Sequence, residues 1–244
     1  MTEPVLFIGG MDSSAGAGIL RDCETARILG TDMRIAVTAV TAQSDHDVSA
    51  IHPVPANDVV AQIRTAGQVG AVKIGMLATA RIAQAVSRSL PLVPLVLDPV
   101  LAASSGRPLL DEDGVGVMLA SLLPQITVLT PNLPELYELA RRLGVSGNAD
   151  EHACVSALMR QGCPAILVKG GHAVSGPECE DRLYLQDGQI IRFSGPRFTG
   201  KLRGTGCQLA SAIAVDLARG AGLRAAVMMA RNAVQDRFHL MHEV

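Results

Sequence analysis

A short glycine-rich turn near the C-terminus is the feature of this sequence that most directly suggests chemistry. Gly204-Thr205-Gly206-Cys207 precedes a run of small and apolar residues, 208–218, that is predicted to be helical. Backbone N–H groups at such a turn can converge on an anion, and the helix dipole adds to the attraction. Small side chains let a phosphate approach the backbone, which suits phosphoryl transfer. A G-x-G turn alone is more often an ordinary helix start, so both interpretations stay open here.

Other polar residues follow short apolar runs that are predicted to be buried strands. Asp98 ends the run Leu95-Val96-Leu97, and Lys169 ends the run 165–168. In a sheet of parallel strands, the ligand site lies at the carboxyl ends of the strands. We therefore expect one pocket to collect the distinctive residues at these ends: 9–12, Gln43, 73–76, 98–100, 130–132 and 169–172.

Strands and helices that could position these residues alternate along the chain. The expected strands are 5–8, 35–42, 71–75, 95–98, 127–130 and 165–169, and a hairpin over 184–193 turns at Asp187-Gly188. The expected helices are 17–29, 57–66, 79–90, 112–122, 133–143, 151–161, 206–219 and 222–240. Repeated βαβ units predict an α/β fold with a mainly parallel sheet. Without a linker or an internal repeat, residues 1–244 are predicted to form one domain.

Composition narrows the class of protein. Hydrophobic residues make up 48% of the 244 residues and charged residues 18%, which favours a well-buried core. The net charge of -2 argues against a nucleic-acid partner. No apolar run approaches the ~20 residues of a membrane span, and the N-terminus lacks the features of a secretory signal. Five cysteines without a C-x-x-C pair indicate free thiols and a cytoplasmic protein.

Seven motifs in order resemble one known family. They are Gly10-Met11-Asp12-Ser13-Ser14-Ala15-Gly16-Ala17-Gly18, Thr38-Ala39-Val40-Thr41-Ala42-Gln43, Lys73-Ile74-Gly75-Met76-Leu77, Asp98-Pro99-Val100, Leu129-Thr130-Pro131-Asn132-Leu133-Pro134-Glu135, Val168-Lys169-Gly170-Gly171-His172 and Gly204-Thr205-Gly206-Cys207. The set, which spans about residues 5–220, resembles hydroxymethylpyrimidine/phosphomethylpyrimidine kinase of thiamine biosynthesis. The resemblance implies a ribokinase-like three-layer α/β/α sandwich. It also implies ATP and Mg²⁺ as cofactors, and transfer of the γ-phosphate to 4-amino-5-hydroxymethyl-2-methylpyrimidine and then to its monophosphate.

The resemblance implies a substrate-binding group of Gln43, Gly10, Asp12, Met76 and Val100. Gln43 would recognise the aminopyrimidine edge, because an amide offers a donor and an acceptor together. Met76 and Val100 would form apolar walls for the ring. From the residues alone, a polar strand end and ordinary core residues are the alternatives.

For the nucleotide and the metal, the resemblance points to five residues. Lys169, Asn132 and Thr205 would bind the nucleotide, with Lys169 neutralising the phosphates. Asp98 and Glu135 would lie near Mg²⁺, in part through water. Glu135 could equally be a first-turn helix residue favoured by the helix dipole.

Cys207, Lys169, Gly204 and Gly206 form the catalytic group that the resemblance implies. Most ribokinase-like enzymes carry Asp at the position of Cys207, whereas Cys is typical of this branch and of a pyridoxal-kinase offshoot. A thiol at a helix N-terminus is expected to have a lowered pKa. It could accept the hydroxyl proton or capture an aldehyde as a hemithioacetal; an inert buried cysteine is the alternative.

The chain departs from the family pattern in several places. Met11 and Ala15 replace Ser and Gly, Leu202-Arg203 replaces Thr-His, and Gln208 replaces Thr. Arg203 adds positive charge beside the glycine turn, either for a phosphate or as a surface guanidinium. The sequence ends at Val244 without the family's G-x-G-P segment, so the sequence leaves open whether one or both phosphorylations take place.

Other functions remain open from the sequence. A pyridoxal kinase of the same fold is the nearest enzymatic alternative, and a catalytically silent pyrimidine-binding sensor is the alternative from another class. The family usually forms dimers, so a homodimer is expected. Residues 175–178, with adjacent Gly and Pro, are the candidate mobile loop.

Overall fold

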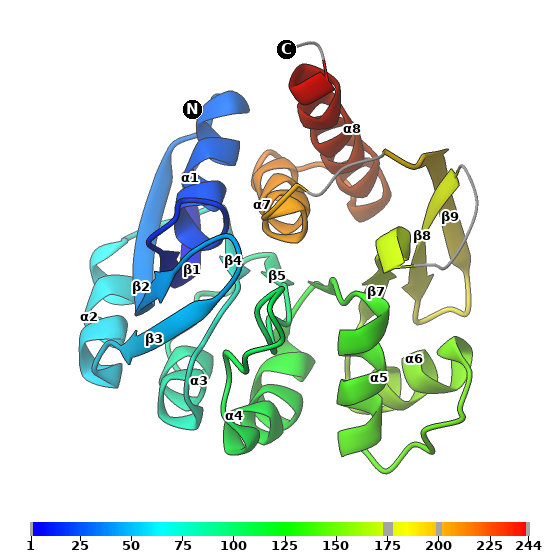
Figure 1. Ribbon diagram of the computed structural model, residues 1–244, viewed down its shortest axis with the longest axis horizontal. Coiled ribbons are helices and arrows are strands. Elements are labelled where there is room, and N and C mark those ends of the chain that lie inside the picture. The colour runs from blue at the N-terminus through cyan, green and yellow to red at the C-terminus, as the bar shows by residue number, and fades with distance from the viewer. Residues whose placement is uncertain (1, 173–177, 199–201, 243–244) are drawn as a thin grey trace.

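Six parallel strands form the centre of the sheet that organises this protein, seen in a computed structural model (Figure 1). The structure describes residues 2–172, 178–198 and 202–242. Within those residues the sheet has nine strands in the order β3-β2-β1-β4-β5-β6-β7-β8-β9. The parallel strands are β1 (Val5–Asp12), β2 (Met33–Gln43), β4 (Ala71–Ile74), β5 (Leu95–Leu97), β6 (Val128–Leu129) and β7 (Ala165–Val168).

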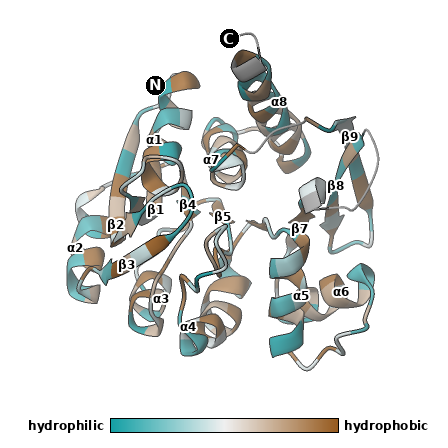
Figure 2. Cartoon of the chain, in the orientation of Figure 1, coloured by the Kyte–Doolittle hydropathy of each residue, from teal (hydrophilic) through white to brown (hydrophobic). Residues whose placement is uncertain are grey.

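Helices cover both faces of this sheet and give the three layers that the sequence predicted (Figure 1). Alternate residues of β1 enter opposite cores, with Leu6 and Ile8 on one side and Val5 and Phe7 on the other. The first core is closed by α2 (Ala56–Thr65), α3 (Ala80–Ser87), α4 (Glu112–Val117), α5 (Leu133–Arg142) and α6 (Glu151–Arg160). The second is closed by α1 (Gly18–Ile28), α7 (Thr205–Ala218) and α8 (Leu223–His242). In Figure 2 helices such as α2 and α5 carry both hydrophilic and hydrophobic residues, as two-faced surface helices do.

The two edges of the sheet are antiparallel. At one edge β3 (Val48–Pro53) pairs with β2, and at the other β8 (Glu178–Leu185) and β9 (Ile190–Pro196) continue from β7. The hairpin predicted at Asp187-Gly188 is confirmed, although its strands extend further in both directions. Strand β3 was not predicted, because only Val48 in it is buried and an edge strand needs no regular apolar alternation.

One expected helix is more irregular than its sequence suggested. The helix predicted over 112–122 ends as α4 at Val117 and continues as a π-helical turn, Met118–Leu122, and a 3-10 turn, Leu123–Gln125. Pro124 lies in the 3-10 turn, and its missing N–H cannot support further α-helix. A second 3-10 turn, Gly170–His172, follows β7. Of the candidate mobile loop, residues 175–177 lie outside the described residues.

Strand β1 contains a β-bulge just before it reaches the site. The register of β1 against β2 shifts between Gly9 and Gly10, and β1 then runs on to Asp12 beside Thr41. A bulge turns a strand without ending its pairing. The end of β1 therefore lies at the same edge as the ends of β4, β5, β6 and β7.

Candidate active site

Lys169 is the centre of a charged cluster at the carboxyl ends of β5, β6 and β7. Its Nζ lies 2.9 Å from Asp98 Oδ1 and 3.8 Å from Glu135 Oε2. Asn132 joins the cluster through a parallel bridge to Lys169. The neighbouring strand ends predicted from the sequence thus do bring Asp98, Asn132 and Lys169 together.

Asp98 and Lys169 each stabilise the charged form of the other. Burial acts to raise the pKa of Asp98, but Lys169 and Lys73 outweigh it and keep that pKa below its usual range. Burial prevails at Glu135 and raises the pKa of that carboxyl despite Lys169. Burial disfavours the Lys169 ammonium, yet Asp98 and Glu135 raise its pKa, so it stays protonated. The result is a fixed cation beside two carboxyl groups.

Glu135 and Asn132 also have a structural role. The Asn132 side chain accepts a hydrogen bond from Glu135 N at 2.9 Å, and Glu135 Oε2 accepts one from Asn132 N at 2.8 Å. This capping box starts α5. The helix-start interpretation of Glu135 is therefore correct, and the same carboxylate still faces Lys169.

The glycine turn lies directly against the charged cluster. A Cβ placed on Gly206 would be 3.2 Å from Lys169 Nζ and 4.0 Å from both Asp98 carboxylate oxygens. Gly204 has φ 73°, in the left-handed region, and a Cβ there would come within 2.5 Å of the Gly16 carbonyl oxygen. The start of α7 is thus held between the first loop and Lys169, and its first-turn N–H groups are available to an anion.

Cys207 is half-buried in the first turn of α7. The charges of Lys73, Asp98 and Asp22 act on its thiol. Burial raises the pKa of this thiol to about 11, and Lys73 opposes the shift only in part. The expected lowering of the pKa by the helix N-terminus is therefore wrong, because loss of solvent and nearby carboxylates outweigh the dipole.

Gly10 and Met76 form a close apolar contact on the other side of the site. A Cβ on Gly10 would lie 2.6 Å from Met76 Sδ, so the thioether lies against the bulged strand. Met76 is buried in the core, and the partly buried Val100 packs against that core. The backbone N–H of Val100 donates to the Asp98 carbonyl at 2.8 Å, so Val100 lies next to the charged cluster.

Gln43 ends β2 beside a surface hollow of about 330 Å³. Its Oε1 accepts a hydrogen bond from Thr41 Oγ1 at 3.2 Å, and its N–H donates to Ser13 Oγ at 2.9 Å. The hollow is lined by Ser13, Ala42, Gln43, Ser44, Asp47 and Ser49. It adjoins the predicted substrate residues only at Gln43.

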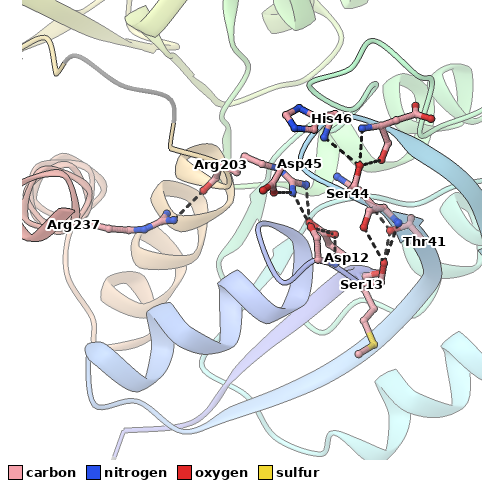
Figure 3. A network of polar contacts seen from close by, with 12 residues as sticks. Asp12, Ser13, Thr41, Ser44, Asp45, His46, Arg203 and Arg237 are labelled. Atoms are coloured by element: carbon pink, nitrogen blue, oxygen red, sulfur yellow. Dashed lines mark hydrogen bonds and ion pairs between the residues drawn. The ribbon is translucent and has the colours of Figure 1, made fainter. Parts of the chain in front are cut away.

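Asp12 is engaged by the protein itself (Figure 3). Its Oδ1 accepts hydrogen bonds from Ser14 N at 2.9 Å and Ser14 Oγ at 2.7 Å, and its Oδ2 pairs with Arg203 at 2.9 Å. Ala15, in the same loop, has φ 59°, a left-handed conformation that costs a non-glycine residue about 1 kcal/mol. Replacement of the family's glycine at this position therefore carries strain.

A buried ion pair beneath the glycine turn was not anticipated from the sequence. Lys73 Nζ lies 2.9 Å from both Asp22 carboxylate oxygens, and Ser211 Oγ donates to Asp22 Oδ1 at 2.7 Å. The side chains of Lys73 and Asp22 are 1% and 0% exposed. The available signal was a lysine inside the apolar strand 71–74, where a charge requires a partner.

The donor set fits a metal that is held mainly by phosphates. Among the described residues no three His, Cys, Asp or Glu groups gather as a metal site. Mg²⁺ commonly takes one or two carboxylates together with substrate phosphates and water. Asp98 and Glu135, both beside Lys169, are the residues that would hold it.

Comparisons with known proteins agree with this geometry. The sequence profile described as phosphomethylpyrimidine kinase matches residues 12–243. The chain belongs to the phosphomethylpyrimidine kinase family. It is 37% identical over 241 residues to the hydroxymethylpyrimidine/phosphomethylpyrimidine kinase of Haemophilus influenzae, covering 95% of this chain and 89% of that one.

Solved structures extend the similarity to the fold of this phosphomethylpyrimidine kinase family member. Phosphomethylpyrimidine kinase from Clostridium difficile superposes with a TM-score of 0.80 at 28% identity, covering 96% of this chain and 99% of that one. Pyridoxal kinase from Staphylococcus aureus, in complex with AMP-PCP and pyridoxal, gives a TM-score of 0.83 at 27% identity, covering 95% and 86%. The ribokinase-like fold expected from the motifs is confirmed.

Proposed function

We propose that this protein phosphorylates 4-amino-5-hydroxymethyl-2-methylpyrimidine and its monophosphate with ATP, in thiamine biosynthesis. The observation that carries the proposal is the approach of Gly206 to Lys169 and Asp98, because it places an anion-binding turn beside a fixed cation. Phosphoryl transfer depends mainly on such positioning and charge neutralisation. Family membership supports the same activity.

In this proposal each end of the site has its own role. Thr205, Gly204 and Gly206 bind the transferred phosphate through the backbone, while Lys169 neutralises its charge. Asn132 orients the nucleotide. Asp98 and Glu135 would hold Mg²⁺, which would screen the phosphate charge.

Gln43, Gly10, Asp12, Met76 and Val100 form the proposed substrate side. Gln43 binds the aminopyrimidine edge, while Met76 and Val100 flank the ring. Asp12 acts by organising the first loop, because its carboxylate oxygens already accept protein hydrogen bonds.

Cys207 is the proposed route for the hydroxyl proton. Only the thiolate can accept a proton, and the raised pKa of the thiol makes this form a minor one near pH 7. The thiol therefore first loses its proton to solvent, and the sulfur then takes the proton of the substrate hydroxyl. The substrate oxygen then bonds to the γ-phosphorus of ATP, and ADP leaves with the electron pair of the broken P–O bond.

Steady-state turnover tests this proposal directly. The purified protein with MgATP is expected to release ADP in the presence of each pyrimidine. The Cys207→Ala variant is expected to release ADP much more slowly. ADP release confined to pyridoxal would support the pyridoxal-kinase alternative. That is the activity named for the S. aureus enzyme of similar fold. Pyrimidine binding without ADP release would contradict the kinase proposal and favour a sensor.

The cellular setting is also a proposal. We propose a cytoplasmic homodimer, on the resemblance to the family. No helix in the described part of the chain is long and apolar enough to cross a bilayer. Light scattering on the purified protein tests the dimer, and a mass of one chain at micromolar concentration would contradict it.

A further inference from the structure

The Arg203 guanidinium joins three segments that are far apart in the sequence (Figure 3). Arg203 belongs to the turn before α7, yet its Nη2 lies 2.9 Å from Asp12 Oδ2 at the end of β1. Its Nη1 lies 2.7 Å from both Ser14 Oγ and Asp45 Oδ1. Asp45 is in the turn between β2 and β3. One side chain therefore connects the glycine turn, the first loop and the β2–β3 turn.

Arg203 is fixed from its backbone as well. Its carbonyl oxygen accepts a hydrogen bond from Arg237 Nη2 at 3.1 Å (Figure 3). Arg237 Nη1 also donates to Gln208 Oε1 at 3.1 Å. A Cβ on Gly16 would lie 2.8 Å from Arg203 Nη1, so the first loop packs directly on the guanidinium. Helix α8 holds one end of the residue while the loops hold the other.

The two ion pairs of Arg203 differ in strength. The Asp12 and Arg203 side chains are 5% and 19% exposed, whereas the Asp45 side chain is 74% exposed. Little water competes for the inner pair, while the outer pair is screened by solvent. Asp12 is thus the anchor, and Asp45 is the weaker contact that the anchored guanidinium presents to the turn.

Gln43 lies between the two segments that Arg203 contacts. Ser13, beside Asp12 and Ser14, accepts the Gln43 N–H at 2.9 Å and donates to the Gln43 carbonyl at 3.2 Å. The next residue, Ser44, starts the turn that carries Asp45, and its N–H donates to the Asp47 carbonyl at 2.8 Å. Any shift of the first loop or of the turn therefore moves Gln43.

We infer that Arg203 is a positioning residue that keeps Gln43 and the pyrimidine-binding side in register with the phosphate-binding turn. The inference rests on the proposed function. Its guanidinium acts through Asp12, Ser14 and Asp45, and it does not read a substrate phosphate. Substrate binding then depends on Arg203, while the ATP side, built on Lys169 and Asp98, does not.

Kinetics of Arg203→Gln test the inference, with Arg203→Lys as the conservative variant. Loss of the charged hydrogen bonds is expected to raise KM for hydroxymethylpyrimidine and for its monophosphate alike, on the order of tenfold. KM for ATP is expected to change less than about twofold. Arg203→Lys recovers part of the loss, because it keeps the charge without the planar fork. Arg141→Gln is the matched control, since Arg141 pairs with Glu138 on the exposed surface of α5.

Three results would overturn the inference: a KM change for the monophosphate alone, which would indicate a direct phosphate contact; an equal rise in KM for ATP; or no change at all. Hydrogen exchange of residues 43–47 gives a readout without substrate, and it is expected to quicken in Arg203→Gln but not in the control. If the native chain phosphorylates neither pyrimidine, the proposed function fails. Unchanged exchange would then contradict the positioning role independently.

Discussion

The phosphate side and the pyrimidine side of this site are built in different ways. Lys169, Asp98 and Glu135 project from short buried strands and a capped helix, and their charges are paired in the interior. On the pyrimidine side, Gln43 ends a strand and is held by Ser13, while Asp45 lies in a turn and pairs with Arg203. One side is fixed by the sheet, and the other is assembled from loops.

This difference indicates where the chain can change. Asp98, Glu135 and Lys169 lie in motifs that resemble the family pattern. The departures from that pattern lie in the first loop and on either side of the glycine turn: Met11, Ala15, Leu202, Arg203 and Gln208. A loop can absorb a substitution by a small movement, while a charge at the end of a buried strand cannot lose its partner cheaply. We therefore expect substitutions of the buried charges to have large effects on stability or turnover, and substitutions in the exposed β2–β3 turn to have small ones.

Lys73→Met gives the largest expected effect. It leaves Asp22 buried without its cation and is expected to lower the free energy of unfolding by about 3–5 kcal/mol. Lys73→Met combined with Asp22→Leu removes both charges and is expected to recover most of that loss. Urea unfolding measures both variants. If Lys73→Met were as stable as the native chain, the ion pair of Lys73 and Asp22 would not be needed to hold the buried charges in place.

Lys169→Met tests the buried side through catalysis. Without the ammonium, Asp98 and Glu135 face the phosphates uncompensated, and kcat is expected to fall about 10²–10³-fold. Lys169→Arg, which keeps the charge, is expected to retain more activity. Steady-state ADP release with hydroxymethylpyrimidine gives kcat, and circular dichroism verifies folding. A loss below about fivefold would remove Lys169 from the catalytic group.

Cys207 lies between the phosphate side and the pyrimidine side, and its raised pKa should be measurable from the pH dependence of its alkylation. Alkylation by iodoacetamide requires the thiolate, so its rate in the folded protein is expected to rise with a midpoint near pH 11. In guanidinium the midpoint should return towards the ordinary value of 9.0. Because the folded thiol keeps its proton longer, the stability it contributes is full below about pH 9 and is lost as pH rises towards 11.

Mass spectrometry of the Cys207 peptide follows this reaction, with Cys207→Ala identifying the peptide. A folded-state midpoint below pH 8 would restore the original expectation that the helix N-terminus lowers the pKa. It would also show that this part of the site is more open to water than its partners indicate.

Asp45→Asn is expected to have the smallest effect. An exposed ion pair contributes about 0–1 kcal/mol, so KM for the pyrimidine should rise less than about fivefold. Asp12→Asn, at the buried end of the same guanidinium, should raise it more. Parallel kinetics of the two variants measure this difference. A larger effect at Asp45 would reverse the assignment of anchor and outer contact.

The sequence alone predicted the central parallel strands and the strand ends at which Asp98 and Lys169 meet. Apolar runs that end in Asp98 or Lys169 mark buried parallel strands, and the carboxyl ends of such strands must meet at one edge. The glycine turn could be placed because a left-handed residue at Gly204 needs no tertiary information.

Long-range contacts were decided only by the tertiary structure. Nothing local indicates that Lys73 pairs with Asp22, 51 residues away, or that Arg203 reaches Asp45, 158 residues away. The pKa of Cys207 was also misjudged, because burial and surrounding carboxylates depend on the packed fold, whereas the helix dipole is a local property. Sequence periodicity determines which residues are buried, but only packing determines which buried charges meet.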